Sequence, residues 1–239
     1  MISTSRHSIV AGTIIGLVLA ATGAALVNRG PDPRFLPELA PAPVTLSDGH
    51  VLHVQKYEVT VAEWNRCYTA GACSLEVRVR PGMDPAATPA TGLSYLDVKQ
   101  YVDWVSAASR HVFRLPTLAE WTELAAEVIP PEPEPLFSDP SLTWASAYLM
   151  ENPPQRALRP SGAFQTTSSG ITDLDGSVWE WTQDCYTGAT PESCPAFYLG
   201  GEHLSVMSLL IRDPARGGCA AGLPPAHLGF RLVTEQPLS

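Results

Sequence analysis

The distribution of apolar and polar positions divides the chain into three parts. They are an apolar N-terminus, a proline-rich stretch, and a long region in which apolar and polar residues alternate with helix or strand periodicity. Residues 9–27 are uncharged and mostly apolar, and as a helix they would span roughly 28 Å, close to the hydrocarbon thickness of a bilayer. We therefore expect residues 1–27 to be an N-terminal transmembrane helix that anchors the protein, with a cleaved signal peptide as the alternative. Residues 28–45 hold five prolines and are predicted to be a stiff linker, and residues 46–239 a folded domain.

Within the folded domain, three segments place a hydroxyl residue three positions before an acid, an arrangement that caps helix starts. We expect the first helix to end near Thr69 and the third near Val128, before two prolines. The alternation of residues 51–57 predicts a strand, and the chain beyond Pro130 reads as short strands between turns. Helices followed by a loop-rich β half predict an α+β domain. The three capping pairs are Thr60 with Glu63, Ser94 with Asp97, and Thr117 with Glu120.

Composition excludes two classes of protein. The chain is 45% hydrophobic and has six tryptophans, so a substantial core can form and disorder is not expected. The net charge is −9 and no cluster of lysine and arginine stands out, so we expect no nucleic-acid partner.

The cysteines agree with an exported domain. Close pairs in a chain with an export signal predict two disulfides, Cys67 with Cys73 and Cys185 with Cys194. A zinc site is the alternative, although the chain has no CxxC pair. Cys219 is left over, either as a small buried apolar residue or as a free functional thiol.

The sequence carries four separated motifs, which are Lys56-Tyr-Glu-Val-Thr60, Arg114-Leu-Pro-Thr-Leu-Ala-Glu-Trp121, Asp173-Leu-Asp-Gly-Ser-Val-Trp-Glu-Trp181 and Gly229-Phe-Arg231. They resemble, in the same order, the motifs of the formylglycine-generating enzyme, or sulfatase-modifying factor, family. This resemblance covers about residues 51–233 and implies that family's variant of the C-type-lectin-like fold, rich in irregular structure. Each motif also has a structural interpretation: a helix cap, an ion pair and a buried tryptophan would join the third helix to the sheet, and Trp179 and Trp181 would share the strand face opposite Glu180.

The resemblance also implies a calcium site. Catalytic relatives hold calcium near the third motif through carbonyl and side-chain oxygens, the ligands that this ion prefers. Here the corresponding residues are Asp175, Ser177, Val178 through its carbonyl, and Glu180. Ser177 replaces the family's asparagine, which removes a longer oxygen arm.

The catalytic cysteines of the family are absent. Its enzymes hold copper(I) with two thiolates that follow a Gly-Gly pair, and aligning that pair with Gly200-Gly201 places Ser205 and Leu210 at the two cysteine positions. His203 and Met207 are soft ligands, but on a strand they would lie about 13 Å apart, too far to share one ion. We therefore expect neither bound copper nor formylglycine synthesis.

These observations lead to two functional hypotheses. The first is a non-catalytic accessory or binding protein, held by its N-terminal helix in the bacterial inner membrane with the domain in the periplasm, or released there after cleavage. Residues 212–231 are similar to proteins encoded beside copper nitrite reductases of denitrifying bacteria, which implies an exported nitrite reductase as the protein partner. The alternative is a metal-dependent oxidoreductase that modifies an exported protein.

Overall fold

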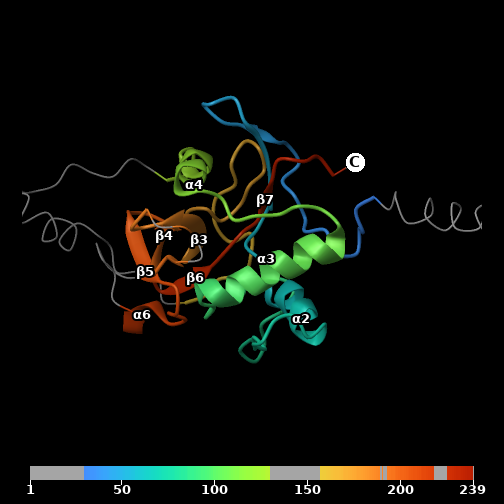
Figure 1. Cartoon of the computed structure of the whole chain (residues 1–239), viewed down its shortest axis with the longest axis vertical. Helices are drawn as coiled ribbons and strands as arrows, with labels where there is room; N and C mark the ends of the chain where they lie inside the picture. Colours follow the sequence, from blue (N-terminus) through green and yellow to red (C-terminus); the bar gives the residue numbers. More distant parts are fainter. Residues whose placement is uncertain (1–29, 130–156, 189, 191–192, 218–224, 239) are drawn as a thin grey trace, which may run out of the picture.

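The computed structural model describes residues 30–129, 157–188, 190, 193–217 and 225–238, which form an α+β domain (Figure 1). One sheet has the order β1 (Val44–Thr45), β2 (Val51–Val54) and β7 (Val233–Thr234). The other has the order β5 (Ser205–Ser208), β4 (Ala196–Gly200), β3 (Val178–Cys185) and β6 (His227–Gly229). The strand pairs are antiparallel apart from β3 with β6, which run parallel.

The three capping pairs start the three longer helices among the described residues. In each pair the hydroxyl accepts from the backbone N–H of the acid, and the acid accepts from the backbone N–H of the hydroxyl residue, so both predicted bonds form. The third helix is shorter than predicted and ends at Ala125. Beyond it, the backbone N–H groups of Val128 and Ile129 both donate to the carbonyl oxygen of Ala125, which ends the regular helical pattern. The helices are α2 (Val61–Thr69), α3 (Tyr95–Ser109), α4 (Leu118–Ala125) and the short α6 (Pro214–Gly217).

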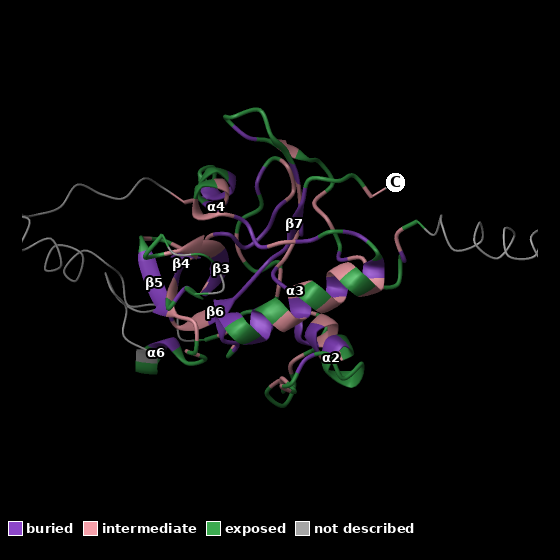
Figure 2. Ribbon diagram, in the orientation of Figure 1, coloured by how far each residue is buried: buried purple, intermediate pink, exposed green. Residues whose placement is uncertain are grey.

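The core has two parts. The larger part lies between α2, α3 and the four-stranded sheet, where the Trp64 ring stacks on Tyr101 at 5.8 Å between centroids. The smaller part joins α4 to β2 and β7 and includes Trp121. In Figure 2 buried and exposed stripes alternate along α3, as expected for a helix with one face on the core.

Both predicted disulfides are confirmed. Cys67–Cys73 closes the C-terminal end of α2, and Cys185–Cys194 joins the end of β3 to the residues before β4.

The proline-rich residues before the domain pack against it from residue 30 onward. The amide of Asp32 donates to the carbonyl of Ser109, and Val44–Thr45 forms strand β1. Residues 30–45 of the predicted stiff linker therefore contact the domain and contribute a strand to it. No described helix is long and apolar enough to cross a membrane, and the predicted anchor lies outside the described residues.

Candidate functional site

An ion pair closed off from solvent lies at the centre of the domain. Glu180 of β3 and Arg231, two residues beyond β6, have no exposed side-chain surface, and Arg231 Nη2 lies 2.7 Å from Glu180 Oε1. The Nε–H of Arg231 is 2.8 Å from both carboxylate oxygens. The indole Nε1–H of Trp121 in α4 donates to Glu180 Oε2 at 2.9 Å. One carboxylate thus connects α4, β3 and the segment after β6.

Arg231 also holds the loops around this pair. Its guanidinium donates to the carbonyl oxygens of Gln55, Lys56 and Thr172 over 3.1–3.3 Å. Burial disfavours the charge, but the Glu180 carboxylate outweighs burial and raises the pKa of Arg231. The fully buried pair cannot touch a substrate, so its role is architectural.

The other motif residues have architectural roles as well. Arg114 forms a two-pronged ion pair with Glu120, both bonds being 2.7 Å long, and Glu120 caps α4. Trp179 and Trp181 belong to the larger part of the core, on the strand face opposite Glu180. The structural interpretation of these motifs is confirmed.

The residues predicted to hold calcium have separate surroundings. Both carboxylate oxygens of Asp175 accept hydrogen bonds from Gln165, and Glu180 is engaged by the buried arginine. Val178 pairs with β6. The Ser177 hydroxyl is buried without a hydrogen-bond partner among the described residues. In that part of the chain no group of three or more histidine, cysteine, aspartate or glutamate residues is arranged to hold a metal, and calcium here stays a prediction.

Ser205 and Leu210, the two positions predicted to replace the copper cysteines of the family, differ in exposure. Ser205 is the first residue of β5, is fully buried and pairs with Leu199 of β4. Leu210 follows β5 and is 66% exposed. The structure therefore does not enclose these two side chains in one pocket.

The soft ligands of this segment serve in packing. Met207 is fully buried and pairs with Phe197 of β4. The His203 ring lies edge-on to Trp179, with centroids 4.5 Å apart. Cys219 lies outside the described residues.

The Gly-Gly pair has a packing role of its own. A Cβ atom at Gly200 would overlap the indole ring of Trp121, and one at Gly201 would overlap the ring of Trp179. The backbone can pass between the two tryptophans because neither residue has a side chain. This explains why a Gly-Gly pair can stay in a chain without the copper cysteines.

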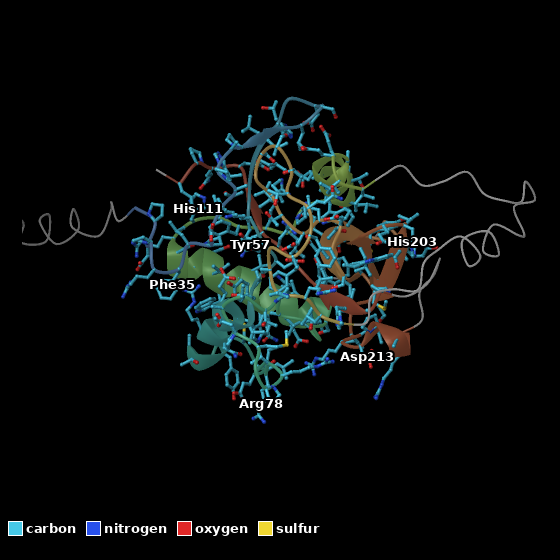
Figure 3. The ribbon with its side chains drawn as sticks, turned by 180° about the vertical axis from the view of Figure 1, so that it is seen from behind. Phe35, Tyr57, Arg78, His111, His203 and Asp213 are labelled. Atoms are coloured by element: carbon cyan, nitrogen blue, oxygen red, sulfur yellow. A yellow bond between two sulfur atoms is a disulfide. The ribbon has the colours of Figure 1, made fainter. Side chains whose placement is uncertain are left out.

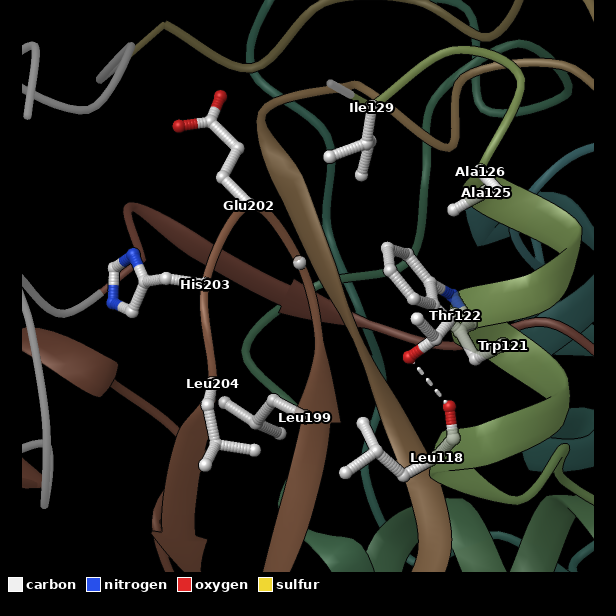
Figure 4. Close-up of a pocket in the computed structure, with 11 residues that line it drawn as sticks. Leu118, Trp121, Thr122, Ala125, Ala126, Ile129, Leu199, Glu202, His203 and Leu204 are labelled. Atoms are coloured by element: carbon white, nitrogen blue, oxygen red, sulfur yellow. Dashed lines mark hydrogen bonds between the residues drawn. The ribbon is translucent and has the colours of Figure 1, made fainter. Parts of the chain in front are cut away.

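A cavity of about 370 Å³ lies between α4 and the hairpin formed by β4 and β5 (Figure 4). The Thr122 hydroxyl on its wall donates to the carbonyl of Leu118, which leaves the wall apolar. Glu202 and His203 belong to the turn of the hairpin and supply polar groups at the cavity. In Figure 4 one wall comes from α4 and the other from the hairpin, with Leu118, Trp121, Thr122, Ala125 and Ala126 on the first and Leu199 and Leu204 on the second.

Glu58 is a buried acid that was not among the functional residues predicted from the sequence. This residue is 2% exposed, and burial, opposed by Arg231 and reinforced by Glu180, raises its pKa to about 8. A signal was present in the sequence, since Glu58 lies between Tyr57 and the apolar Val59 in the first of the four motifs. Burial of an acid between apolar neighbours identifies a group with an unusual environment.

Comparison with known proteins identifies a family and a set of similar folds. The family model described as a sulfatase-modifying factor enzyme 1-like domain matches residues 12–236. No curated protein matches. PvdO from Pseudomonas aeruginosa aligns with a TM-score of 0.50 and 19% identity over 77% of this chain and 80% of that one. CarF aligns with a TM-score of 0.49 and 17% identity over 78% and 87% of the two chains. At such identities the likeness to PvdO shows the fold alone.

Proposed function

The chain belongs to the sulfatase-modifying factor family, and we propose that it is a non-catalytic member that acts as a binding and accessory protein in the bacterial cell envelope. The observation that carries the proposal is the replacement of the two copper positions. The hydroxyl of Ser205 is a poor ligand for copper(I), and Leu210 has no ligand atom. The surrounding scaffold is intact, because Gly200 still packs on Trp121.

The cavity beside α4 supports a binding role. Its walls are apolar, and Leu204 at its edge is 54% exposed. Apolar concave surfaces with a few polar groups at the edge are typical of sites that receive an apolar side chain. We propose that a protein partner inserts such a side chain between α4 and the hairpin.

We propose an exported nitrite reductase as the partner, because residues 212–231 are similar to proteins that are encoded beside such enzymes. We propose the periplasmic face of the inner membrane as the location, because the apolar residues 9–27 are long enough to anchor the chain in a membrane. Calcium bound near residues 175–180 would stabilise the domain without taking part in a reaction.

Co-purification of the full chain, extracted in detergent, with nitrite reductase tests the proposal. We expect the reductase to be retained by the wild-type chain and lost with Leu204→Glu, because a charge at the cavity edge opposes burial of an apolar anchor. Val112→Glu is the matched control, since Val112 is 63% exposed and does not line this cavity. Equal retention by both variants would contradict the proposed surface.

Metal analysis of the same preparation separates the accessory role from the oxidoreductase hypothesis. One equivalent of tightly bound copper or iron per chain would contradict a non-catalytic role. A deletion strain with unchanged reductase copper content and activity would contradict the nitrite reductase partnership.

A further inference from the structure

A second cavity, of about 620 Å³, opens on a different part of the molecule. Tyr57 lines this cavity, whereas His203 lines the first, and the two residues are well separated in Figure 3. The second cavity lies where the segment between β2 and α2 meets the loop at residues 86–87 and Ser161. It shares no lining residue with the cavity beside α4.

Two buried oxygen atoms of the lining residues have no hydrogen-bond partner among the described residues. They are Oε2 of Glu58 and the hydroxyl oxygen of Ser161. The Glu58 side chain is almost completely buried, and a buried acceptor without a donor carries a desolvation penalty. A ligand that brings N–H donors to these two oxygens would remove that penalty.

The charges around the cavity favour a cation. Glu38, Glu58 and Glu63 line it, and Arg66 is the one lysine or arginine among the lining residues. The Arg66 Nη1–H already donates to the carbonyl of Arg34. Lys56 pairs with Glu38 at 3.0 Å, on the side of the cavity where Glu38 is well exposed.

An anion is disfavoured at the same place. The cavity lies at the start of α2, where free backbone amides would otherwise attract a phosphate or carboxylate. Here Glu63 accepts from the amide and hydroxyl of Thr60, and the Thr60 hydroxyl accepts from the amide of Glu63. This capping box fills the helix start with a carboxylate of the protein itself.

We propose that this cavity binds a compact organic cation, a guanidinium or primary ammonium group, whose N–H donors reach Glu58 Oε2 and the Ser161 hydroxyl. The cation can be a free small molecule or the end of an arginine or lysine side chain in a peptide. Both present the same chemistry to the two acceptors, and both fit a cavity that opens to solvent.

Binding is coupled to a proton. Arg231 lowers the pKa of Glu58, but burial and the nearby Glu180 and Asp173 outweigh it, so the free protein holds Glu58 protonated at neutral pH. The other charged residues that line the cavity are Glu38, Glu63 and Arg66. An ionised Glu58 attracts the cation more strongly than the neutral acid does, so the cation displaces the proton. Affinity therefore rises with pH until Glu58 is ionised in the free protein, by about tenfold per pH unit below a pKa of about 8.

Isothermal titration of the full chain with propylguanidine, compared with its neutral isostere propylurea, tests the proposal. We expect the guanidine to bind at least about tenfold more tightly, since hydrogen bonds to charged groups are the stronger kind. Titration at pH 7 in buffers of different ionisation enthalpy should show close to one proton released per ligand. Equal binding of the two compounds, or no binding of either, would overturn the proposal.

The variant Glu58→Gln isolates the carboxylate. It resembles the protonated acid in shape, so we expect it to fold like the wild type at pH 6 but to lose both the guanidine preference and the proton release. Glu235→Gln is the matched control and should change the affinity less than threefold, because Glu235 does not line this cavity and its side chain is 62% exposed. Unchanged guanidine binding by Glu58→Gln would overturn the proposal. Should that variant fail to fold, the proton release measured with the wild-type chain still tests the proposal, and guanidine binding without proton release would contradict it.

A third titration distinguishes the two sources of the cation. Tighter binding of an arginine peptide, blocked at both ends, than of propylguanidine would assign the cavity to a basic segment of a protein. Tighter binding of propylguanidine would assign it to a free small molecule. Either order supports the cation site, and binding of neither compound contradicts it.

Discussion

Replacement of the buried arginine, Arg231→Met, should strongly destabilise the domain. The substitution leaves the Glu180 carboxylate buried without its counter-charge, since neither side chain has exposed surface. It also removes the donor from the carbonyl oxygens of Gln55, Lys56 and Thr172. Removing one partner of a buried ion pair costs about 3–5 kcal/mol, because the remaining charge is left in a medium that solvates it poorly.

Urea denaturation of the full chain, followed by tryptophan fluorescence, measures this loss. Thermal unfolding of the same variant gives a second measurement. For a domain of this size, 1 kcal/mol corresponds to roughly 2–4 °C in Tm, so a loss of about 3–5 kcal/mol should lower the Tm by about 6–20 °C. Arg78→Met is the matched control. The Arg78 side chain is 83% exposed in its pair with Glu76, and its replacement should cost less than about 1 kcal/mol.

The double variant Arg231→Met with Glu180→Leu tests the cause of the loss. When both charges are removed, no uncompensated charge stays buried, and most of the stability should return. The indole N–H of Trp121 loses its acceptor, so the recovery is incomplete. A single variant no less stable than the Arg78 control would refute this account of the ion pair.

Three further predictions concern packing, covalent bonds and pH. Gly200→Ala should lose about 1–3 kcal/mol by urea denaturation because its Cβ would overlap an indole ring, whereas Gly30→Ala, which has open space around it, should lose little. Replacing Cys67 and Cys73 together by serine should lower the free energy of unfolding by about 2–3 kcal/mol. Added reductant should then lower the free energy of unfolding of the variant by less than that of the wild type. Glu58 has a folded pKa raised from 4.5 to about 8, so its contribution is fully present below pH 4.5 and is lost as the pH rises through 8. Urea denaturation across this range should show the decline in the wild type, and a Glu58→Gln variant without a flatter profile would contradict it.

Local signals in the sequence determined the helix starts and the disulfides. A capping box needs residues only three positions apart, so Thr60 and Glu63 predict the start of α2 without any knowledge of its tertiary contacts. Cys67 and Cys73 are joined across six residues, a separation short enough to be visible in the sequence. The four motifs likewise identified the family, because their order along the chain is a property of the sequence.

Helix and strand ends were predicted less well, because tertiary contacts set them. The predicted strand at residues 51–57 stops at Val54, after which Gln55 pairs with Leu39 from the proline-rich segment. The helix α4 ends at Ala125, three residues before Val128. Nothing within either segment marks these positions.

Long-range contacts decided what each motif residue does. The sequence placed Glu180 among the predicted calcium ligands, and only the fold shows that Arg231 from 51 positions away and Trp121 from 59 donate to it. The sequence alone shows the Gly-Gly pair and predicts that Ser205 and Leu210 stand where the family has its copper cysteines. Only the tertiary structure decided that the pair passes between two tryptophans and that Glu58 is buried with an acceptor unused. The reason is physical: capping and short disulfides depend on neighbours in the chain, whereas burial and charge pairing depend on which distant segments the core brings together.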